Sequence, residues 1–421
     1  MEKIVVKSGQ KLSGEVNISL AKNSVLPIIA ATILADDPVV IKNYPKLEDV
    51  KVLTEVLNDI GCYINMDEPS HNLKIDSSSI NKYTANSELV RKMRASFLIM
   101  GPMLAKYKRF RLASPGGCNI GTRPIDLHLK GFEGLGAKVI QKHGFVEVIG
   151  ENLKGSTIYL DFPSVGATEN LIMAASLIEG KTTIINPALE PEIEDLANFL
   201  NSMGAKIKGA GKGNIEIEGV KSLSGGEYTP IYDRIEAGTF MVAAAITCSK
   251  IKINGVEENH LKPVIEKLKE IGTSISVDNE TKIAVVEGSD VILPTDIKTM
   301  PYPGYPTDMQ SQIMSLLSLA RGNSVIEESV FENRFMNAAE LCRMGANIKI
   351  RGNSAIIQGV NKLTGCEVKA TDLRAGASLI LAGLVAEGYT KISDIYHIDR
   401  GYVNIEEKFR ALGAEIYRIN D

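Results

Sequence analysis

The segment Ile60-Gly61-Cys62 recurs in altered form along the whole chain, and this recurrence decides the fold. The further copies read Leu135-Gly136-Ala137, Met203-Gly204-Ala205, Ile271-Gly272-Thr273, Met344-Gly345-Ala346 and Leu412-Gly413-Ala414. Successive glycines lie 75, 68, 68, 73 and 68 residues apart. Self-similarity at a nearly fixed period is typical of an internal repeat, so the chain consists of six copies of one unit.

Each of these glycines follows a stretch with helical periodicity. In the first copy, apolar residues from Val50 to Ile60 recur at the period of an amphipathic helix. Glycine at its end suits the left-handed conformation of a helix C-cap. Further upstream lies a second segment that is apolar or small on every side, as in residues 26–35, 171–178 and 240–246, and this pattern predicts a buried helix.

The order of elements in one unit is therefore strand, buried helix, strand, outer helix and two paired strands. At 421 residues the chain exceeds the roughly 250–300 residues at which one hydrophobic core stops growing. We expect two domains of three βαβαββ-type units each, with buried helices packed together beneath an outer layer of sheets and helices. The predicted class is α/β (α+β), and a cleft would lie between the two similar domains.

Composition narrows the class of protein. The net charge is -4 and tryptophan is absent. The chain therefore lacks the basic, aromatic-rich pattern of a nucleic-acid binder. The longest apolar stretch, residues 25–35, is too short to span a bilayer. We therefore expect a cytoplasmic enzyme that binds neither nucleic acid nor membrane.

Cysteine and histidine positions bear on metal binding. The cysteines are Cys62, Cys118, Cys248, Cys342 and Cys366. They are odd in number and widely spaced, with no C-x-x-C pair, which argues against a disulfide framework or a cysteine-rich zinc site. The histidines show no metal-ligand spacing, and we predict no metal site.

Polar residues gather where each buried helix is expected to begin. A helix N-terminus presents free N–H groups and the positive end of the helix dipole, which favour anions. One charge there could simply be solvated, but the recurrence in six copies predicts an anion-binding surface. These residues are Lys22 and Asn23; Arg91 and Arg94; Ser164 and Gly166; Asp233, Arg234 and Glu236; Asp308 and Gln310; and Asp372 and Arg374.

Cys118 lies in a glycine-rich stretch, residues 114–121, whose proline and glycine content predicts a loop. Arg109, Arg111 and Arg123 are near it in sequence, and such surroundings lower the pKa of a thiol. A structural cysteine packed beneath the loop fits the local sequence as well. Its role stays open at this level.

Two other segments combine groups suited to chemistry. Residues 123–128 place a basic, an acidic and an imidazole side chain before an outer helix, although a capped helix start would explain Asp126 equally well and His128 could be an ordinary core or surface histidine. Arg334 and Arg400 hold matching places in the fifth and sixth copies. Guanidinium groups bind carboxylate or phosphate in a planar, bidentate manner, and interdomain salt bridges are the alternative.

Five of these segments together resemble a known family over the whole chain. They are Ala21-Lys22-Asn23, Pro115-Gly116-Gly117-Cys118, Arg123-Pro124-Ile125-Asp126-Leu127-His128, Pro306-Thr307-Asp308-Met309-Gln310 and His397-Ile398-Asp399-Arg400-Gly401-Tyr402. Their joint pattern is similar to that of the UDP-N-acetylglucosamine 1-carboxyvinyltransferases, within the EPSP synthase superfamily. The resemblance implies a two-domain inside-out α/β barrel, with domains of residues 22–229 and of residues 1–21 plus 230–421.

The resemblance also implies a reaction. The enolpyruvyl group of phosphoenolpyruvate would pass to the 3-hydroxyl of UDP-N-acetylglucosamine through a tetrahedral intermediate, with release of phosphate and without a cofactor. This is the first committed step of bacterial peptidoglycan synthesis. Cys118 would be the proton donor, able also to form a phospholactoyl thioether, and Asp308 the base.

Carried over residue by residue, the resemblance implies two substrate sites between the domains. The catalytic set would be Cys118, Asp308, Lys22 and Arg400. Phosphoenolpyruvate would be held by Lys22, Asn23, Arg123, Arg334, Arg374 and Arg400. UDP-N-acetylglucosamine would be held by Arg94, Arg123, Pro124, Ile125, Asp126, Leu127, Ser164, Val165, Gly166, Asp308 and Val330.

Two alternatives remain at this level. A 5-enolpyruvylshikimate-3-phosphate synthase would share the repeats and the phosphoenolpyruvate chemistry, but it lacks the cysteine of the glycine-rich loop. A non-catalytic paralogue that senses nucleotide-sugars would keep the cleft. The presence of Cys118, Asp308, Lys22 and Arg400 argues against such a regulator.

Overall fold

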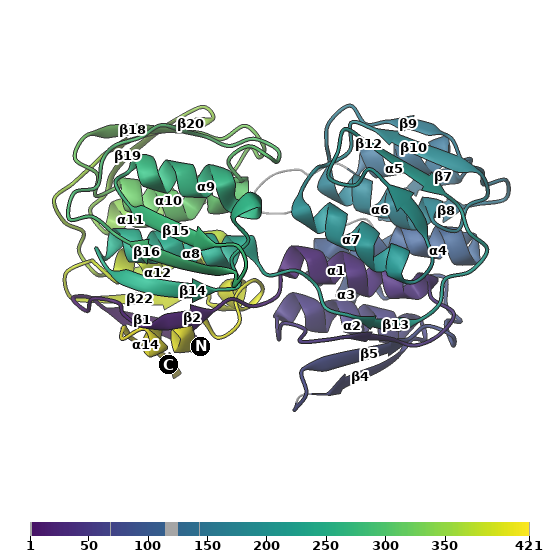
Figure 1. The fold of residues 1–421 in the computed structure, drawn as a ribbon, viewed down its shortest axis with the longest axis horizontal. Helices are drawn as coiled ribbons and strands as arrows, with labels where there is room; N and C mark the ends of the chain where they lie inside the picture. Colours follow the sequence, from purple (N-terminus) through teal and green to yellow (C-terminus); the bar gives the residue numbers. More distant parts are fainter. Residues whose placement is uncertain (1, 68, 114–124, 143, 421) are drawn as a thin grey trace. The chain divides into compact units, whose positions relative to one another are not determined.

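The computed structural model describes residues 2–67, 69–113, 125–142 and 144–420. These residues divide into two compact units. The middle unit comprises the described residues from Leu20 to Ile231, and the terminal unit joins the residues up to Ser19 to those from Tyr232 onward. Figure 1 shows both units.

In the described part of the middle unit, three helices form the core. In α6 every residue from Ala167 to Ala175 is buried, which explains why its sequence is apolar or small on all sides. The outer helices bury only one face. The core helices are α1 (Lys22–Ala31), α4 (Met100–Tyr107) and α6 (Val165–Ala175), the outer ones are α2 (Glu48–Ile60), α5 (Asp126–Gly134) and α7 (Pro191–Ser202), and the short ones are η1 (Thr32–Leu34), α3 (Ser87–Lys92) and η2 (Arg94–Ile99).

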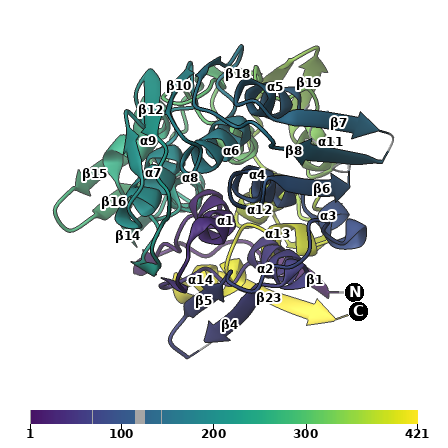
Figure 2. The same cartoon turned by 90° about the vertical axis from the view of Figure 1, so that its right-hand side faces the viewer.

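Small sheets cover these helices (Figure 2), in the orders β13-β3-β5-β4, β6-β8-β7 and β11-β12-β10-β9. Strand β13, at the end of the unit, pairs in parallel with β3 near its beginning, so the sheet of the first repeat is completed by the last segment of the third. The strands are β3 (Val39–Ile41), β4 (Tyr63–Asp67), β5 (Asn72–Asp76), β6 (Arg109–Ala113), β7 (Lys138–Lys142), β8 (Phe145–Ile149), β9 (Thr157–Tyr159), β10 (Lys181–Ile185), β11 (Lys206–Lys208), β12 (Asn214–Glu218) and β13 (Gly226–Tyr228).

The terminal unit repeats this plan. All residues of α8 are buried, and its N-cap Asp233 accepts hydrogen bonds from the backbone N–H groups of Ile235 and Glu236 at 2.8 and 3.0 Å, as a helix start favours. The core helices are α8 (Arg234–Ile246), α10 (Gln310–Leu317) and α12 (Leu373–Gly383), the outer ones are α9 (Glu258–Glu270), α11 (Met336–Arg343) and α14 (Ile405–Ala411), and the short ones are η3 (Thr307–Met309) and α13 (Tyr396–Asp399).

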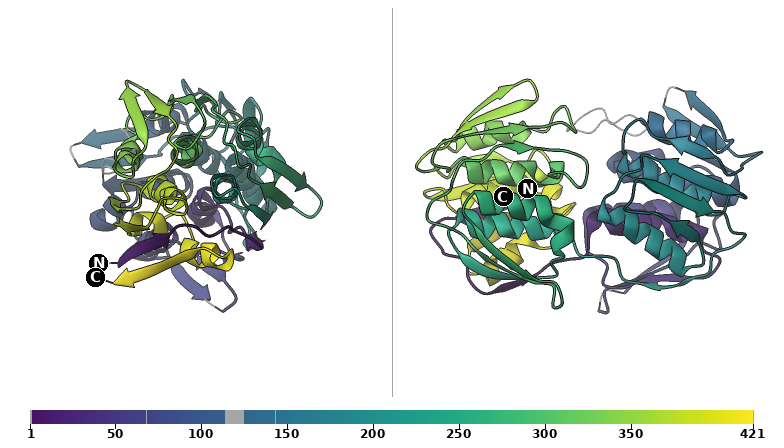
Figure 3. Two further views of the ribbon diagram at one scale, coloured as in Figure 1. Left: turned by 90° about the vertical axis from the view of Figure 1, so that its left-hand side faces the viewer. Right: turned by 45° about the horizontal axis from the view of Figure 1, so that its top comes forward.

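The sheets of the terminal unit have the orders β15-β16-β14-β2, β17-β18-β20-β19 and β21-β22-β1-β23. Strand β1 lies between β22 and β23 and pairs antiparallel with both. The left view of Figure 3 shows β1 in purple beside β23 in yellow. The strands are β1 (Glu2–Lys7), β2 (Glu15–Asn17), β14 (Lys250–Asn254), β15 (Ser274–Asp278), β16 (Ile283–Glu287), β17 (Ile297–Lys298), β18 (Asn323–Glu327), β19 (Asn347–Arg351), β20 (Ser354–Gln358), β21 (Glu367–Lys369), β22 (Tyr389–Ser393) and β23 (Glu415–Asn420).

The repeat glycines behave as the sequence predicted. All six have a positive φ, from 88° at Gly136 to 111° at Gly61, so each turns the chain after an outer helix in a conformation that glycine adopts without steric cost. Together with the helices and sheets of both units, these glycines confirm the α/β class, the inside-out arrangement and the six repeats. No helix among the described residues is long and apolar enough to cross a membrane.

A second repeated glycine was missed at the level of sequence. Gly219 and Gly359 donate backbone hydrogen bonds of 3.0 Å to the carbonyls of Gly180 and Gly322. A Cβ at Gly219 would lie 1.7 Å from the carbonyl oxygen of Ile178, and one at Gly359 equally close to that of Ala320. Each glycine lets a strand end pass directly over the end of a core helix.

Candidate functional site

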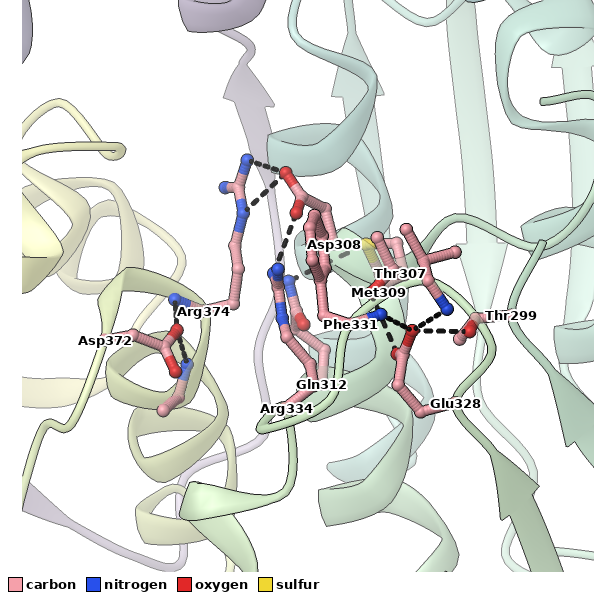
Figure 4. A network of polar contacts seen from close by, with 12 residues as sticks. Thr299, Thr307, Asp308, Met309, Gln312, Glu328, Phe331, Arg334, Asp372 and Arg374 are labelled. Atoms are coloured by element: carbon pink, nitrogen blue, oxygen red, sulfur yellow. Dashed lines mark hydrogen bonds and ion pairs between the residues drawn. The ribbon is translucent and has the colours of Figure 1, made fainter. Parts of the chain in front are cut away.

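Asp308 lies between two buried arginines of the terminal unit (Figure 4). Its carboxylate accepts a hydrogen bond of 2.7 Å from Arg334 Nη2 through Oδ1, and one of 2.9 Å from Arg374 Nη2 through Oδ2. The arginine side chains are 2% and 1% exposed, whereas that of Asp308 is 25% exposed. The three residues come from η3, the loop before α11 and the start of α12, so separate repeats build one charged cluster.

The two guanidinium groups share Asp308 as their hydrogen-bonded carboxylate. Burial acts to raise the pKa of Asp308, but the positive charges of Arg374 and Arg334 hold that pKa well below its usual range, so the carboxylate is ionised. Three nitrogens, Arg334 Nε and Nη1 and Arg374 Nη1, are buried without a hydrogen-bond partner in the described part of the chain. Buried donors are normally satisfied, so two guanidinium groups facing one carboxylate are suited to receive a further anion.

Arg374 is held in place from two sides. The N-cap Asp372 accepts hydrogen bonds from the backbone N–H groups of Arg374 and Ala375 at 2.8 and 3.0 Å. The Arg374 guanidinium lies 5.4 Å from the ring centre of Tyr402, a cation–π distance. The Tyr402 hydroxyl is in turn 2.9 Å from Thr239 Oγ1, which ties the ring to α8.

Lys22 of the middle unit is paired with an aspartate that sequence analysis missed. Its Nζ lies 2.7 Å from Asp49 Oδ2, and the two side chains are 9% and 4% exposed. Lys22 begins α1 and Asp49 is in the first turn of α2. An acidic residue at the start of an outer helix looks like an ordinary favourable dipole contact, so nothing in the sequence distinguished Asp49. Asn23 follows Lys22 and is partly buried.

His128 of α5 lies close to residues of α6 and to Arg94, the first residue of η2. Its Nδ1 accepts a hydrogen bond of 2.9 Å from the side-chain amide of Asn170, which places the ring proton on Nε2. Burial, with the nearby charge of Arg94, lowers the pKa of His128 to about 3. A Cβ on Gly166 would lie 3.2 Å from the ring. The imidazole is therefore a neutral core group that packs α5 against the start of α6.

The predicted nucleotide-sugar residues around His128 fall at element starts. Arg94 is the first residue of η2, Ser164 caps α6 through a 3.4 Å hydrogen bond from the Ala167 N–H, and Ile125, not Asp126, occupies the N-cap of α5. Asp126 is the first residue of that helix and is exposed. Leu127, Val165 and Gly166 are partly buried beside these starts.

The remaining predicted residues divide into two groups. Cys118, Arg123 and Pro124 lie outside the described residues. Arg400 is the C-cap residue that follows α13, and Val330 lies in the loop after β18; both are partly buried. Within the described residues, no group of three or more His, Cys, Asp or Glu side chains is placed to hold a metal ion.

Comparison with known proteins gives this site a context. Residues 6–409 match the family model for EPSP synthase (3-phosphoshikimate 1-carboxyvinyltransferase). The chain is 62% identical over 419 residues to UDP-N-acetylglucosamine 1-carboxyvinyltransferase 2 of Clostridium tetani, with 100% of both chains covered. It is also 62% identical over 421 residues to UDP-N-acetylglucosamine 1-carboxyvinyltransferase 1 of Clostridium perfringens, again with 100% of both chains covered.

Solved structures show the same fold. The enolpyruvyl transferase NikO from Streptomyces tendae has a TM-score of 0.90 at 25% identity, covering 100% of this chain and 99% of that one. EPSP synthase from Acinetobacter baumannii has a TM-score of 0.76 at 20% identity, with 100% of both chains covered.

Proposed function

This chain belongs to the EPSP synthase family, and from that premise we propose that it transfers the enolpyruvyl group of phosphoenolpyruvate to the 3-hydroxyl of UDP-N-acetylglucosamine. Phosphate is the second product, and the reaction serves peptidoglycan and cell wall synthesis. The acceptor is chosen because full-length relatives at 62% identity carry the name UDP-N-acetylglucosamine 1-carboxyvinyltransferase.

The observation that carries the chemistry is the Asp308 carboxylate between Arg334 and Arg374. Phosphoenolpyruvate bears a carboxylate and a phosphate, which planar guanidinium groups bind well. An ionised carboxylate beside them can accept a proton. When a substrate anion binds the arginines, their charge is partly neutralised, and the basicity of Asp308 rises.

The proposed reaction has two stages. In the addition, the 3-hydroxyl oxygen of the sugar bonds to C2 of phosphoenolpyruvate, the hydroxyl proton passes to Asp308, and C3 gains a proton from Cys118. In the elimination, the Cys118 thiolate takes a proton back from C3 while the C2–O bond to phosphate breaks, and the departing phosphate takes the proton held by Asp308. This forms the enol ether, frees phosphate and returns both residues to their starting states. Arginine and lysine stabilise charge that develops on the reacting groups.

The other residues take roles in this proposal by resemblance. Lys22, Asn23, Arg123 and Arg400 complete the phosphoenolpyruvate site. The segments around Arg94, Ile125 to Leu127 and Ser164 to Gly166, together with Asp308 and Val330, form the nucleotide-sugar site. Residues 22–229 and residues 1–21 plus 230–421 act as the two domains. A cytoplasmic location is supported by the odd, widely spaced cysteines.

The experiment offers phosphoenolpyruvate with either UDP-N-acetylglucosamine or shikimate 3-phosphate and measures phosphate release. We expect release with the nucleotide-sugar only. Release with shikimate 3-phosphate alone would make the chain an EPSP synthase. Binding of the nucleotide-sugar without turnover of either acceptor would make it a regulator.

A further inference from the structure

Glu328 is a buried carboxylate that accepts four hydrogen bonds (Figure 4). Glu328 as a whole residue is 3% exposed. Oε1 accepts from Thr299 Oγ1 at 2.8 Å, from Val330 N at 2.8 Å and from Phe331 N at 3.1 Å. Oε2 accepts from Thr307 Oγ1 at 2.8 Å. One side chain thus joins three separate stretches of the terminal unit.

These stretches carry both members of an ion pair. Thr307 directly precedes Asp308 in η3. Phe331 starts the turn that leads to Arg334, and the Arg334 guanidinium lies 5.4 Å from its ring centre. Glu328 therefore connects the backbone that positions the Asp308 carboxylate with the backbone that positions the Arg334 guanidinium, and the two groups meet at 2.7 Å.

The network uses both oxygens of the Glu328 side chain as acceptors. Burying an ionised carboxylate is costly unless it is hydrogen-bonded, and here two backbone N–H groups and two hydroxyls provide for it. A glutamine at this position would keep the shape, but its amide NH2 cannot accept a hydrogen bond. A glutamine oxygen could keep the three contacts of Oε1, so the contact with Thr307 Oγ1 is the one that requires the second carboxylate oxygen as acceptor.

We propose that Glu328 is a positioning residue for enolpyruvyl transfer. Through Thr307 it sets the direction of the Asp308 carboxylate, and through the N–H groups of Val330 and Phe331 it shapes the backbone that faces the nucleotide-sugar. This inference rests on the proposed function, because it assigns Asp308 and Val330 to the acceptor site.

The first experiment uses a matched pair at Thr307. Thr307→Val keeps the side-chain shape without the hydroxyl, and Thr307→Ser keeps the hydroxyl. We expect Thr307→Val to lower kcat/KM for UDP-N-acetylglucosamine about tenfold, as for a lost hydrogen bond to a charged group, and Thr307→Ser to stay near wild type. Thr390→Val is the control, because this buried hydroxyl in β22 has no hydrogen-bond partner among the described residues.

The second experiment measures positioning without catalysis. In Glu328→Ala, which removes the oxygen that accepts from both amides, hydrogen exchange of the Val330 and Phe331 amides should speed up about tenfold or more, and calorimetric binding of UDP-N-acetylglucosamine should weaken by about the same factor. Wild-type exchange at both amides, or equal losses in Thr307→Val and Thr307→Ser, would overturn the inference. If exchange responds but wild-type protein releases no phosphate with this acceptor, the positioning network stands and the proposed function fails.

Discussion

Arg374 donates two hydrogen bonds to one oxygen of Asp308, over 2.9 Å from Nη2 and 3.3 Å from Nε. The second oxygen of Asp308 faces Arg334. This arrangement keeps the carboxylate ionised and directs it, which are two requirements for a base.

The first prediction concerns Asp308 as the base. Asp308→Asn keeps the shape and removes the charge, so kcat should fall by about 100-fold to 10,000-fold in a phosphate-release assay. Glu367→Gln makes the same chemical change at an exposed carboxylate of β21 and should leave kcat unchanged. An Asp308→Asn variant within tenfold of wild type would remove Asp308 from the mechanism.

The second prediction concerns pH and stability. The pKa of Asp308 is lower in the folded protein than in the unfolded chain. The ionised carboxylate therefore stabilises the fold at pH values above the pKa of the unfolded chain. This contribution to stability is lost as the pH falls below that pKa. The stability gap between wild type and Asp308→Asn, measured by urea unfolding, should be constant near neutral pH and shrink below about pH 4. A gap that grows on acidification would contradict the assignment.

The third prediction tests the buried pair of Lys22 and Asp49. Asp49→Ala leaves a buried ammonium without this partner and should cost about 3 kcal/mol or more in the free energy of unfolding. Glu216→Ala breaks a pair with Lys181 of similar length, 2.9 Å, but with both side chains more than half exposed, and it should cost less than about 1 kcal/mol. Equal losses in the free energy of unfolding would mean that the buried contact between Lys22 and Asp49 stabilises the protein no more than an exposed ion pair does.

The fourth prediction follows from the strand-end glycines. Gly219→Ala places a Cβ against the Ile178 carbonyl, where only backbone can move, and it should destabilise the protein by about 3 kcal/mol or more. Gly226→Ala, where nothing lies within 4 Å of the added carbon, should stay within about 0.5 kcal/mol of wild type. Thermal unfolding of both variants checks this, and a stable Gly219→Ala would argue against the close contact.

The fifth prediction concerns thiol reactivity. Burial raises the pKa of Cys62 to about 12, and it also raises the pKa values of Cys248 and Cys366. At about pH 8, near the ordinary thiol pKa, a thiol-reactive epoxide analogue of phosphoenolpyruvate should label Cys118 first and abolish activity. Peptide mapping by mass spectrometry locates the label, and Cys118→Ser should not take it. Labelling of Cys62 or Cys248 instead would count against the role of Cys118.

The repeat could be predicted because its signals are local. Each repeat glycine ends an amphipathic helix within a few residues, and each core helix is apolar over consecutive positions. The starts of these helices could be located for the same reason, so Lys22, Asp308 and Arg374 were found where polar residues interrupt apolar runs.

Asp49 and Glu328 could not be recognised, because their roles depend on partners that are distant in sequence or on backbone groups. Asp49 meets Lys22 across two helices. Glu328 follows another glutamate after a short strand, a pattern typical of a solvated surface, and two of its donors are backbone N–H groups. Gly219 was missed for the same reason, since the carbonyl over it belongs to another element.

The place of β1 between β22 and β23 has a consequence for biosynthesis. Roughly 380 residues separate the end of β1 from the start of β22, and translation at ~5–20 residues per second takes roughly 20 to 75 s to cover them. The middle unit emerges from the ribosome complete, while the first strand of the terminal unit still waits for its neighbours. Nascent chains stalled before β22 should therefore protect the middle unit from protease and leave residues 2–7 open to cleavage.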